Sequence, residues 1–98
     1  MNTDQIEFLR TLEAVIEQRK IASADKSYTA ELFAAGAARI AQKVGEEAVE
    51  LAIASVSGDG RERILSEAAD LVYHLLVLLT ANDLRLSDVA VELQKRHR

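Results

Sequence analysis

The sequence contains no cysteine, no proline and no tryptophan among its 98 residues. Without cysteine, a disulfide framework and thiolate metal sites are excluded, which fits a reducing compartment. Because proline breaks helix interiors, its absence is compatible with an all-α chain. Only 4% of the residues are aromatic although 49% are hydrophobic. The core must therefore consist mainly of Leu, Ile, Val and Ala, which are typical of packed helices.

Charge and the length of the hydrophobic runs argue against two classes of partner. The net charge of −4 does not supply the basic face that a nucleic acid requires. The longest uncharged run, between Leu71 and Asp83, is too short to span a bilayer. Charged residues also interrupt the segment from Ile6 to Ile16, so we expect no signal peptide. We expect a cytoplasmic protein with no nucleic-acid or membrane partner, although a phosphate ligand could still bind through a cation.

Hydrophobic periodicity predicts four to five helices. The pattern places them over residues 4–20, 30–35, 37–56 and 61–81, with a fifth, short helix near the C-terminus. No linker or repeat divides the chain, so residues 1–98 are expected to form a single domain. The fold class expected is all-α, an antiparallel helical bundle.

Capping and turn residues mark the ends of these helices. Ser27 or Thr29 can cap the second helix, and Ser87 is expected to cap the fifth. The segment Ser57–Gly60 contains two glycines that are free to take positive φ, so a tight turn there makes the two long helices antiparallel neighbours. Asn82 is expected to end the fourth helix in a left-handed conformation.

The second half of the fourth helix is apolar nearly all the way round. It reads LVYHLLVLLTA from Leu71 to Ala81. A helix of this kind must be covered on every side, and so short a chain has few other helices to cover it. We therefore predict that homodimerisation, or a higher homo-oligomer, completes the bundle.

The third helix carries a cluster of acids. Glu46 and Glu47 lie four and three residues before Glu50, while Arg39 and Lys43 precede them on the same stripe. Gly45 stands in the helix interior at a cost of about 1 kcal/mol relative to alanine. Either a neighbouring helix crosses closely there or a ligand needs access to the backbone.

The fourth helix carries a second group of polar residues. Glu67, Asp70 and His74 share one helical face, in a stretch that is otherwise apolar. His74 is expected to be a core histidine that bonds to Asp70 or Tyr73 rather than a metal ligand.

Five acids on two adjoining helices repel one another unless a counter-charge lies among them. Two carboxylates 4 Å apart repel by about 1 kcal/mol in water and several-fold more near a protein surface. Either some of the acids are protonated, or bases pair with them, or a divalent cation lies among them. Two bases on the stripe are too few to neutralise five acids, so we expect the cation. Carboxylate oxygens favour Mg²⁺, with Mn²⁺ as a substitute. The alternative is a solvated helix face with pairs such as Lys43 with Glu47.

Together these motifs resemble a known family. The pattern E-E-x-x-E at residues 46–50, followed by E-x-x-D at residues 67–70, resembles the metal-binding signature of the all-α nucleoside triphosphate pyrophosphohydrolases. More narrowly, SYTAELFAAGAARIAQKVGEEAVE and EAADLVYHLLVLL, with the closing S-D-V-x-x-E-L-x-x-R-H, resemble the phosphoribosyl-ATP pyrophosphohydrolase family over nearly the whole chain. The chain looks like the free-standing form and not a fusion to the cyclohydrolase of the next step.

The resemblance implies an activity, a cofactor and a set of ligands. The activity is hydrolysis of 1-(5-phosphoribosyl)-ATP to 1-(5-phosphoribosyl)-AMP and pyrophosphate, the second step of histidine biosynthesis. The cofactor is Mg²⁺, and its ligands would be Glu47, Glu50, Glu67 and Asp70. The catalytic group that positions and deprotonates water would be Glu46 or one of the metal-bound acids such as Glu47.

Further side chains are expected to contact the nucleotide. These candidate substrate-binding residues are Ser27, Tyr28, Arg39, Lys43, Lys95 and Arg96. Each has a simpler alternative: Arg39 can form a surface salt bridge, and Ser27 and Tyr28 can serve only to start a helix. Lys95 and Arg96 also suit a helix C-terminus, and they reach the site only if the last helix folds near it.

Two rival functions remain. One is a house-cleaning pyrophosphohydrolase of ordinary or damaged nucleoside triphosphates, for which the acids would be the same. The other is a non-catalytic helical dimerisation module whose acids only keep it in solution.

Overall fold

A computed structural model describes residues 4–97, and these residues are almost entirely helical. The elements in chain order are α1 (Asp4–Arg19), the 3₁₀ segment η1 (Ala24–Lys26), α2 (Tyr28–Ala35), α3 (Ala37–Val56), α4 (Arg61–Ala81) and α5 (Leu86–Arg96). No strand occurs in this part of the chain. The all-α class predicted from the sequence is therefore confirmed.

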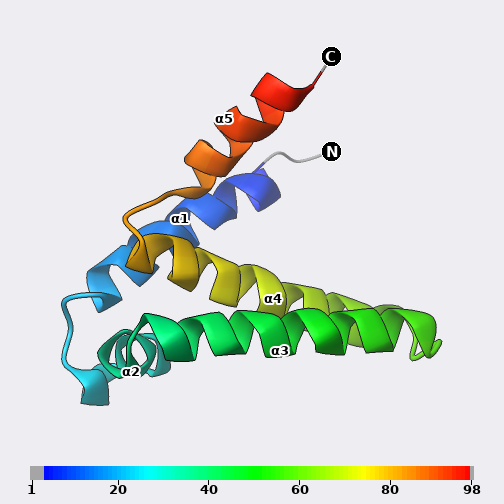
Figure 1. Ribbon diagram of the computed structural model, residues 1–98, viewed down its shortest axis with the longest axis horizontal. Coiled ribbons are helices and arrows are strands. Elements are labelled where there is room, and N and C mark those ends of the chain that lie inside the picture. The colour runs from blue at the N-terminus through cyan, green and yellow to red at the C-terminus, as the bar shows by residue number, and fades with distance from the viewer. Residues whose placement is uncertain (1–3, 98) are drawn as a thin grey trace.

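The two long helices α3 and α4 form an antiparallel hairpin that is the axis of the molecule (Figure 1). Their connection contains Gly58 with φ 68° and Gly60 with φ 96°. Side chains with a Cβ rarely take these angles, so the two glycines allow the tight reversal that the sequence predicted. The reversal places the acid-bearing faces of α3 and α4 beside one another.

The hydrophobic core lies at the end of the hairpin farther from this turn. There α1 and α2 pack against the start of α3 and the end of α4 (Figure 1). The buried core side chains are Ile16, Leu32, Ile40, Leu76 and Val77. Burial of each large aliphatic side chain contributes about 1.5–3 kcal/mol.

The end of the hairpin nearer the turn has only two helical layers among the described residues (Figure 1). Large apolar side chains are exposed there on both helices: Val49, Ile53, Val56 and Leu65. A single chain thus consists of the antiparallel pair α3 and α4, with α1 and α2 crossing it at one end. The helices of one described chain do not form a complete bundle along the whole length of α3 and α4.

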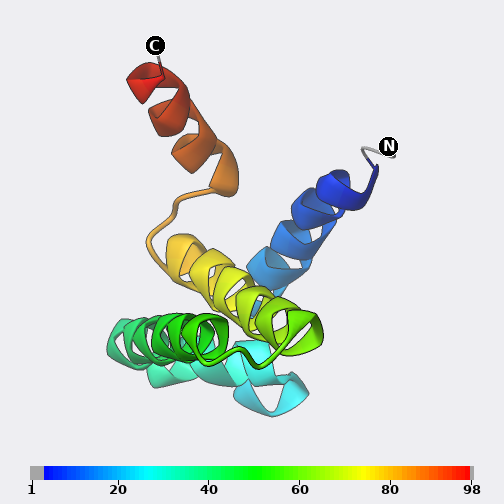
Figure 2. The same cartoon turned by 90° about the vertical axis from the view of Figure 1, so that its right-hand side faces the viewer.

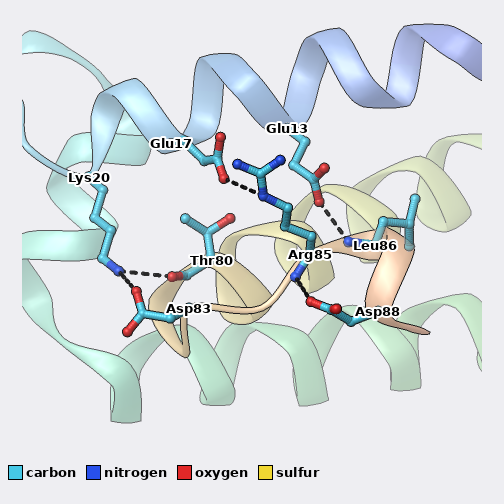
Figure 3. A network of polar contacts seen from close by, with 8 residues as sticks. All are labelled: Glu13, Glu17, Lys20, Thr80, Asp83, Arg85, Leu86 and Asp88. Atoms are coloured by element: carbon cyan, nitrogen blue, oxygen red, sulfur yellow. Dashed lines mark hydrogen bonds and ion pairs between the residues drawn. The ribbon is translucent and has the colours of Figure 1, made fainter. Parts of the chain in front are cut away.

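Lys20, at the end of α1, is bonded to the end of α4 (Figure 3). Its Nζ donates to the carbonyl of Thr80 at 3.0 Å and to the carboxylate of Asp83 at 2.8 Å. The left-handed residue after α4 is Asp83, with φ 59°, and not Asn82, which has φ −102°. The helix does end at Asn82, whose side-chain amide donates to the Leu78 carbonyl at 2.9 Å, but the left-handed conformation predicted for Asn82 occurs one residue later.

The start of α5 is also tied to α1 (Figure 3). The backbone N–H of Leu86 donates to Glu13 at 2.7 Å. Ser87 was expected to cap this helix, but the helix already begins at Leu86. Asp88 provides the cap instead, because its carboxylate accepts the backbone N–H of Arg85 at 2.9 Å.

Beyond this joint, α5 extends away from the hairpin and diverges from α1 (Figure 2). Its last-turn bases Lys95 and Arg96 pair with Glu92 on their own helix, at 3.6 and 3.1 Å. Within one chain, these two bases therefore lie away from the acids of α3 and α4.

Candidate metal and catalytic site

Three of the predicted ligands converge between α3 and α4. Glu47, Glu50 and Glu67 each offer a carboxylate oxygen, and these oxygens lie within 4.8 Å of one another. Glu47 and Glu67 are only 7% and 6% exposed, whereas Glu50 is open to solvent. The hairpin thus brings together acids that are far apart in the sequence, as the motif spacing predicted.

One oxygen of each buried acid has no hydrogen-bond partner among the described residues. These are Oε1 of Glu47 and Oε1 of Glu67. A buried polar atom that is left unpaired costs about 1–3 kcal/mol, and a charged one costs more. Because such oxygens are hard ligands that Mg²⁺ and Mn²⁺ prefer, the cluster fits a divalent cation.

The second oxygen of each buried acid is paired with a base. Lys43 Nζ lies 3.4 Å from Glu47 Oε2, and Arg63 Nε lies 2.8 Å from Glu67 Oε2. Both bases precede their acids by four residues, the spacing of neighbours on one helix face. The pairs hold each carboxylate by one oxygen and leave the other for a ligand.

The cluster changes the acid strength of its members. The charge of Glu47, then burial and the charge of Glu67, raise the pKa of Glu50 above its ordinary value. Burial lowers the pKa of Lys43, but its hydrogen bond with Glu47 and nearby negative charges outweigh this, so the pKa is raised overall. The bases therefore balance the repulsion between the carboxylates only in part.

Glu46, a candidate for the catalytic base, lies beside the cluster but outside it. Its carboxylate accepts a hydrogen bond from Gln42 at 3.0 Å and lies 3.6 Å from Lys43. The bond from Gln42, together with the charges of Lys43 and Arg39, lowers the pKa of Glu46 against the opposing effect of burial. Its side chain is 45% exposed, so it is accessible to water beside the cluster.

Asp70, the fourth predicted ligand, does not join the three converging acids in this structure. It lies one turn after Glu67 on α4 and is exposed. Its backbone carbonyl accepts the Nδ1–H of His74 at 2.8 Å. Asp70 is thus near the cluster along the helix, and its role as a ligand stays a prediction.

His74 connects α4 with the start of α2. Because Nδ1 donates to the Asp70 carbonyl, Nε2 is an acceptor, and the hydroxyl of Tyr28 donates to it at 3.0 Å. His74 is only 5% exposed, as expected of a satisfied core histidine. Of the two partners predicted from the sequence, His74 bonds to Asp70, through the backbone carbonyl, and not to Tyr73. The rings of Tyr73 and His74 lie edge to face with their centroids 5.0 Å apart.

The remaining candidates for substrate binding differ in their surroundings. Ser27 caps α2, because its hydroxyl accepts the N–H of Ala30 at 3.0 Å. Tyr28 keeps 48% of its surface exposed. Arg39 is exposed on the stripe that leads to Lys43. Tyr28 and Arg39 are therefore available to a ligand, and Ser27 has a structural role whether or not it also binds one.

Sequence reasoning missed Arg63. It lies in the first turn of α4, outside the acid motifs, and it pairs with the most deeply placed acid of that helix. The sequence feature that could have indicated Arg63 is its spacing of four residues from Glu67. The burial of Glu67, which the spacing does not show, distinguishes this pair from an ordinary surface ion pair.

Comparison with known proteins identifies close relatives. A family model described as phosphoribosyl-ATP pyrophosphohydrolase matches residues 9–97. The chain is 56% identical over 90 residues to the histidine biosynthesis bifunctional protein HisIE of Photobacterium profundum, covering 92% of this chain and 43% of that protein. It is 51% identical over 92 residues to the phosphoribosyl-ATP pyrophosphatase of Pyrobaculum islandicum, covering 94% and 97%. The chain thus spans less than half of the bifunctional relative and nearly all of the shorter one.

Proposed function

Because the chain belongs to the phosphoribosyl-ATP pyrophosphohydrolase family, we propose that it hydrolyses 1-(5-phosphoribosyl)-ATP to 1-(5-phosphoribosyl)-AMP and pyrophosphate. In this reaction water adds at phosphorus while the bond between the α- and β-phosphates breaks. The step belongs to histidine biosynthesis, and we place it in the cytoplasm. The observation that carries the proposal is the pair of buried, unpartnered oxygens on Glu47 and Glu67 beside Glu50.

The acids provide the metal site of this proposal. Glu47, Glu50 and Glu67 would hold Mg²⁺, or Mn²⁺ in its place, with Asp70 as the fourth ligand. The bound cation supplies Lewis-acid stabilisation of the charge that builds up on the leaving pyrophosphate. Glu46 or one of the clustered acids takes the proton from the attacking water, and the half-exposed position of Glu46 supports the first choice.

The bases and Tyr28 provide the substrate contacts. Lys43 is charged and lies at the cluster, where its ammonium group pairs with Glu46 and Glu47 and has a third N–H that can meet a phosphate oxygen. Arg39 extends the same stripe and Tyr28 faces solvent at the start of α2. A contact from Lys95 or Arg96 would need the neighbouring copy, because α5 of the same chain points away (Figure 2).

We also propose that the protein is a homodimer or a higher homo-oligomer. The support is the two-layered end of the hairpin, where Val49 is 57% exposed, Ile53 54% and Val56 85%. A second copy packed there would cover this surface and supply the missing helical layers. A side chain at Gly45 would have no atom outside its own stretch of helix within 4 Å of its Cβ position. No other helix of the described residues therefore crosses at Gly45, and the backbone there is open to a partner or a ligand.

The composition of α4 also has a second interpretation. This helix is long and apolar enough to cross a membrane by length and composition alone. It nevertheless carries the buried acid Glu67 and packs along α3, as core helices of globular proteins do. We therefore attribute its apolar surface to packing within and between copies of the chain.

The test is turnover of phosphoribosyl-ATP beside dATP, dUTP and dCTP, measured as pyrophosphate release with Mg²⁺, with Mn²⁺ and with EDTA. We expect phosphoribosyl-ATP to be preferred and EDTA to abolish turnover. A clear preference for an ordinary nucleotide would instead support a house-cleaning enzyme. No turnover, with a melting temperature that Mg²⁺ does not change, would support a non-catalytic module, because a real site gains stability when its ion binds.

A further inference from the structure

Arg63 is the counter-charge of a carboxylate that has almost no contact with water. Its Nε lies 2.8 Å from Glu67 Oε2, and the two side chains are 57% and 9% exposed. No other base of the described residues forms an ion pair with Glu67. A buried carboxylate that lost this partner would be left without compensation, which is strongly unfavourable.

The two bases at the acid cluster differ in how firmly they are held. Lys43 is 20% exposed and lies within 4 Å of both Glu46 and Glu47. Arg63 is more than half exposed and contacts a single acid, at the edge of the hairpin near the turn. A long, exposed side chain with one contact can move away from that contact with little loss of packing. Arg63, rather than Lys43, is therefore the base that a cation can displace.

We propose that Arg63 is a positioning residue that stands in for the divalent cation: its guanidinium balances Glu67 in the metal-free protein and leaves Glu67 when a cation binds between Glu47, Glu50 and Glu67. This inference rests on the metal site of the proposed function. The pairing with Arg63 explains how the nearly buried Glu67 carboxylate is tolerated without a cation. When a cation binds, it replaces the guanidinium as the positive charge beside Glu67.

Two effects of Arg63 on cation affinity oppose one another. By holding Oε2, Arg63 orients Glu67 and so favours binding through Oε1. By its positive charge, it would repel a doubly charged ion held by Glu67. Arg63 is 57% exposed and holds Glu67 by one contact, so its effect on the orientation of Glu67 is small. The repulsion is between one charge on the guanidinium and two charges on the ion. The charge effect is larger, so loss of Arg63 strengthens cation binding.

The experiment is a calorimetric titration of Mn²⁺ into the full chain without substrate, for the wild type and three variants. Arg63→Gln removes the charge, and Arg63→Lys keeps it. Arg61→Gln is the matched control, because it changes the net charge equally on the same helix and forms no ion pair among the described residues. Circular dichroism confirms that each variant is helical.

We expect Arg63→Gln to bind Mn²⁺ about 3- to 10-fold more tightly, whereas Arg63→Lys and Arg61→Gln stay within about 2-fold of the wild type, where tenfold corresponds to about 1.4 kcal/mol. Without metal, Arg63→Gln should melt below the wild type, and saturating Mn²⁺ should remove the difference.

Mn²⁺ binding by Arg63→Gln that is unchanged or weaker than that of the wild type would contradict the proposed displacement of Arg63. An equal increase in Mn²⁺ affinity in Arg61→Gln would contradict it as well. If the wild type binds no Mn²⁺, the proposed metal site itself fails, and the displacement fails with it. The wild-type titration thus separates failure of the proposed function from failure of this inference.

Discussion

Glu47 on α3 and Glu67 on α4 present carboxylate oxygens within 4.8 Å of one another, although each residue is more than nine-tenths buried. Two like charges so placed cost free energy in the metal-free chain. Residues that lower stability in the absence of a ligand are typical of binding sites, where the bound ligand offsets the unfavourable free energy. The pair is therefore the feature by which the metal hypothesis can be tested most directly.

The first prediction concerns Glu47→Gln. The amide keeps the shape of the side chain but is a poor ligand for a hard cation, so turnover should fall beyond the roughly 10- to 100-fold that loss of a ligand's supporting residue costs. The metal-free protein should melt at the same temperature or higher, because a charge that repels Glu50 and Glu67 is gone and Lys43 keeps its pairing with Glu46. Steady-state kinetics and a thermal melt in EDTA measure both effects. Undiminished turnover would remove Glu47 from the ligand set.

The convergence of Glu47, Glu50 and Glu67 could be predicted because it follows from short-range rules. Helical spacing sets which acids share a face, and a turn with two glycines sets the antiparallel pairing of α3 and α4. Each rule depends on residues close together in the sequence.

Features that depend on long-range contacts were harder to predict. The left-handed residue is Asp83 and not Asn82, and its carboxylate is paired with Lys20, which follows α1 and is distant in the sequence. The cap of α5 is made by Asp88 rather than Ser87. The direction of α5 depends on only a few contacts at its base with α1, which no local pattern encodes.

The second prediction concerns Asp70, the acid that the structure leaves outside the converging group. If it completes the ligand set, Asp70→Asn should weaken Mn²⁺ binding and sharply reduce turnover while the fold stays intact. Asp59→Asn, in the exposed turn between α3 and α4, is a control with the same change of charge. Mn²⁺ affinity equal to that of the wild type would limit the ligands to the three glutamates.

The third prediction concerns pH. The hydrogen bond from Lys20, and then its charge, lower the pKa of Asp83 below its ordinary value of 3.8. The folded state therefore favours the carboxylate, so the pair stabilises the protein above that ordinary value and the gain is lost as the pH falls through the lowered pKa. Asp83→Asn should thus reduce stability near about pH 7 and reduce it less near about pH 3, below the ordinary pKa of the carboxyl group.

Asparagine suits this test because, like aspartate, it tolerates the left-handed conformation with φ 59° at residue 83. Urea unfolding at both pH values measures the difference. Asp59→Asn again serves as the control for net charge, since Asp59 lies in the turn before α4, whereas Lys20 contacts the end of α4. An Asp83→Asn effect of equal size at both pH values would show that the Lys20 pair contributes nothing.

The last prediction concerns self-association through the two-layered end of the hairpin. Ile53 is 54% exposed on α3, in the turn of helix that follows Glu50. Ile53→Glu should raise the dissociation constant of a homodimer by at least about 10-fold, because it places a charge in an apolar interface. Ile21→Glu is the matched control, since Ile21 is 91% exposed outside the hairpin. Sedimentation velocity at several concentrations measures the change. If the wild type is a monomer throughout, or if both variants associate equally, this surface is not the interface. The acids of α3 would then face solvent without help from a second copy.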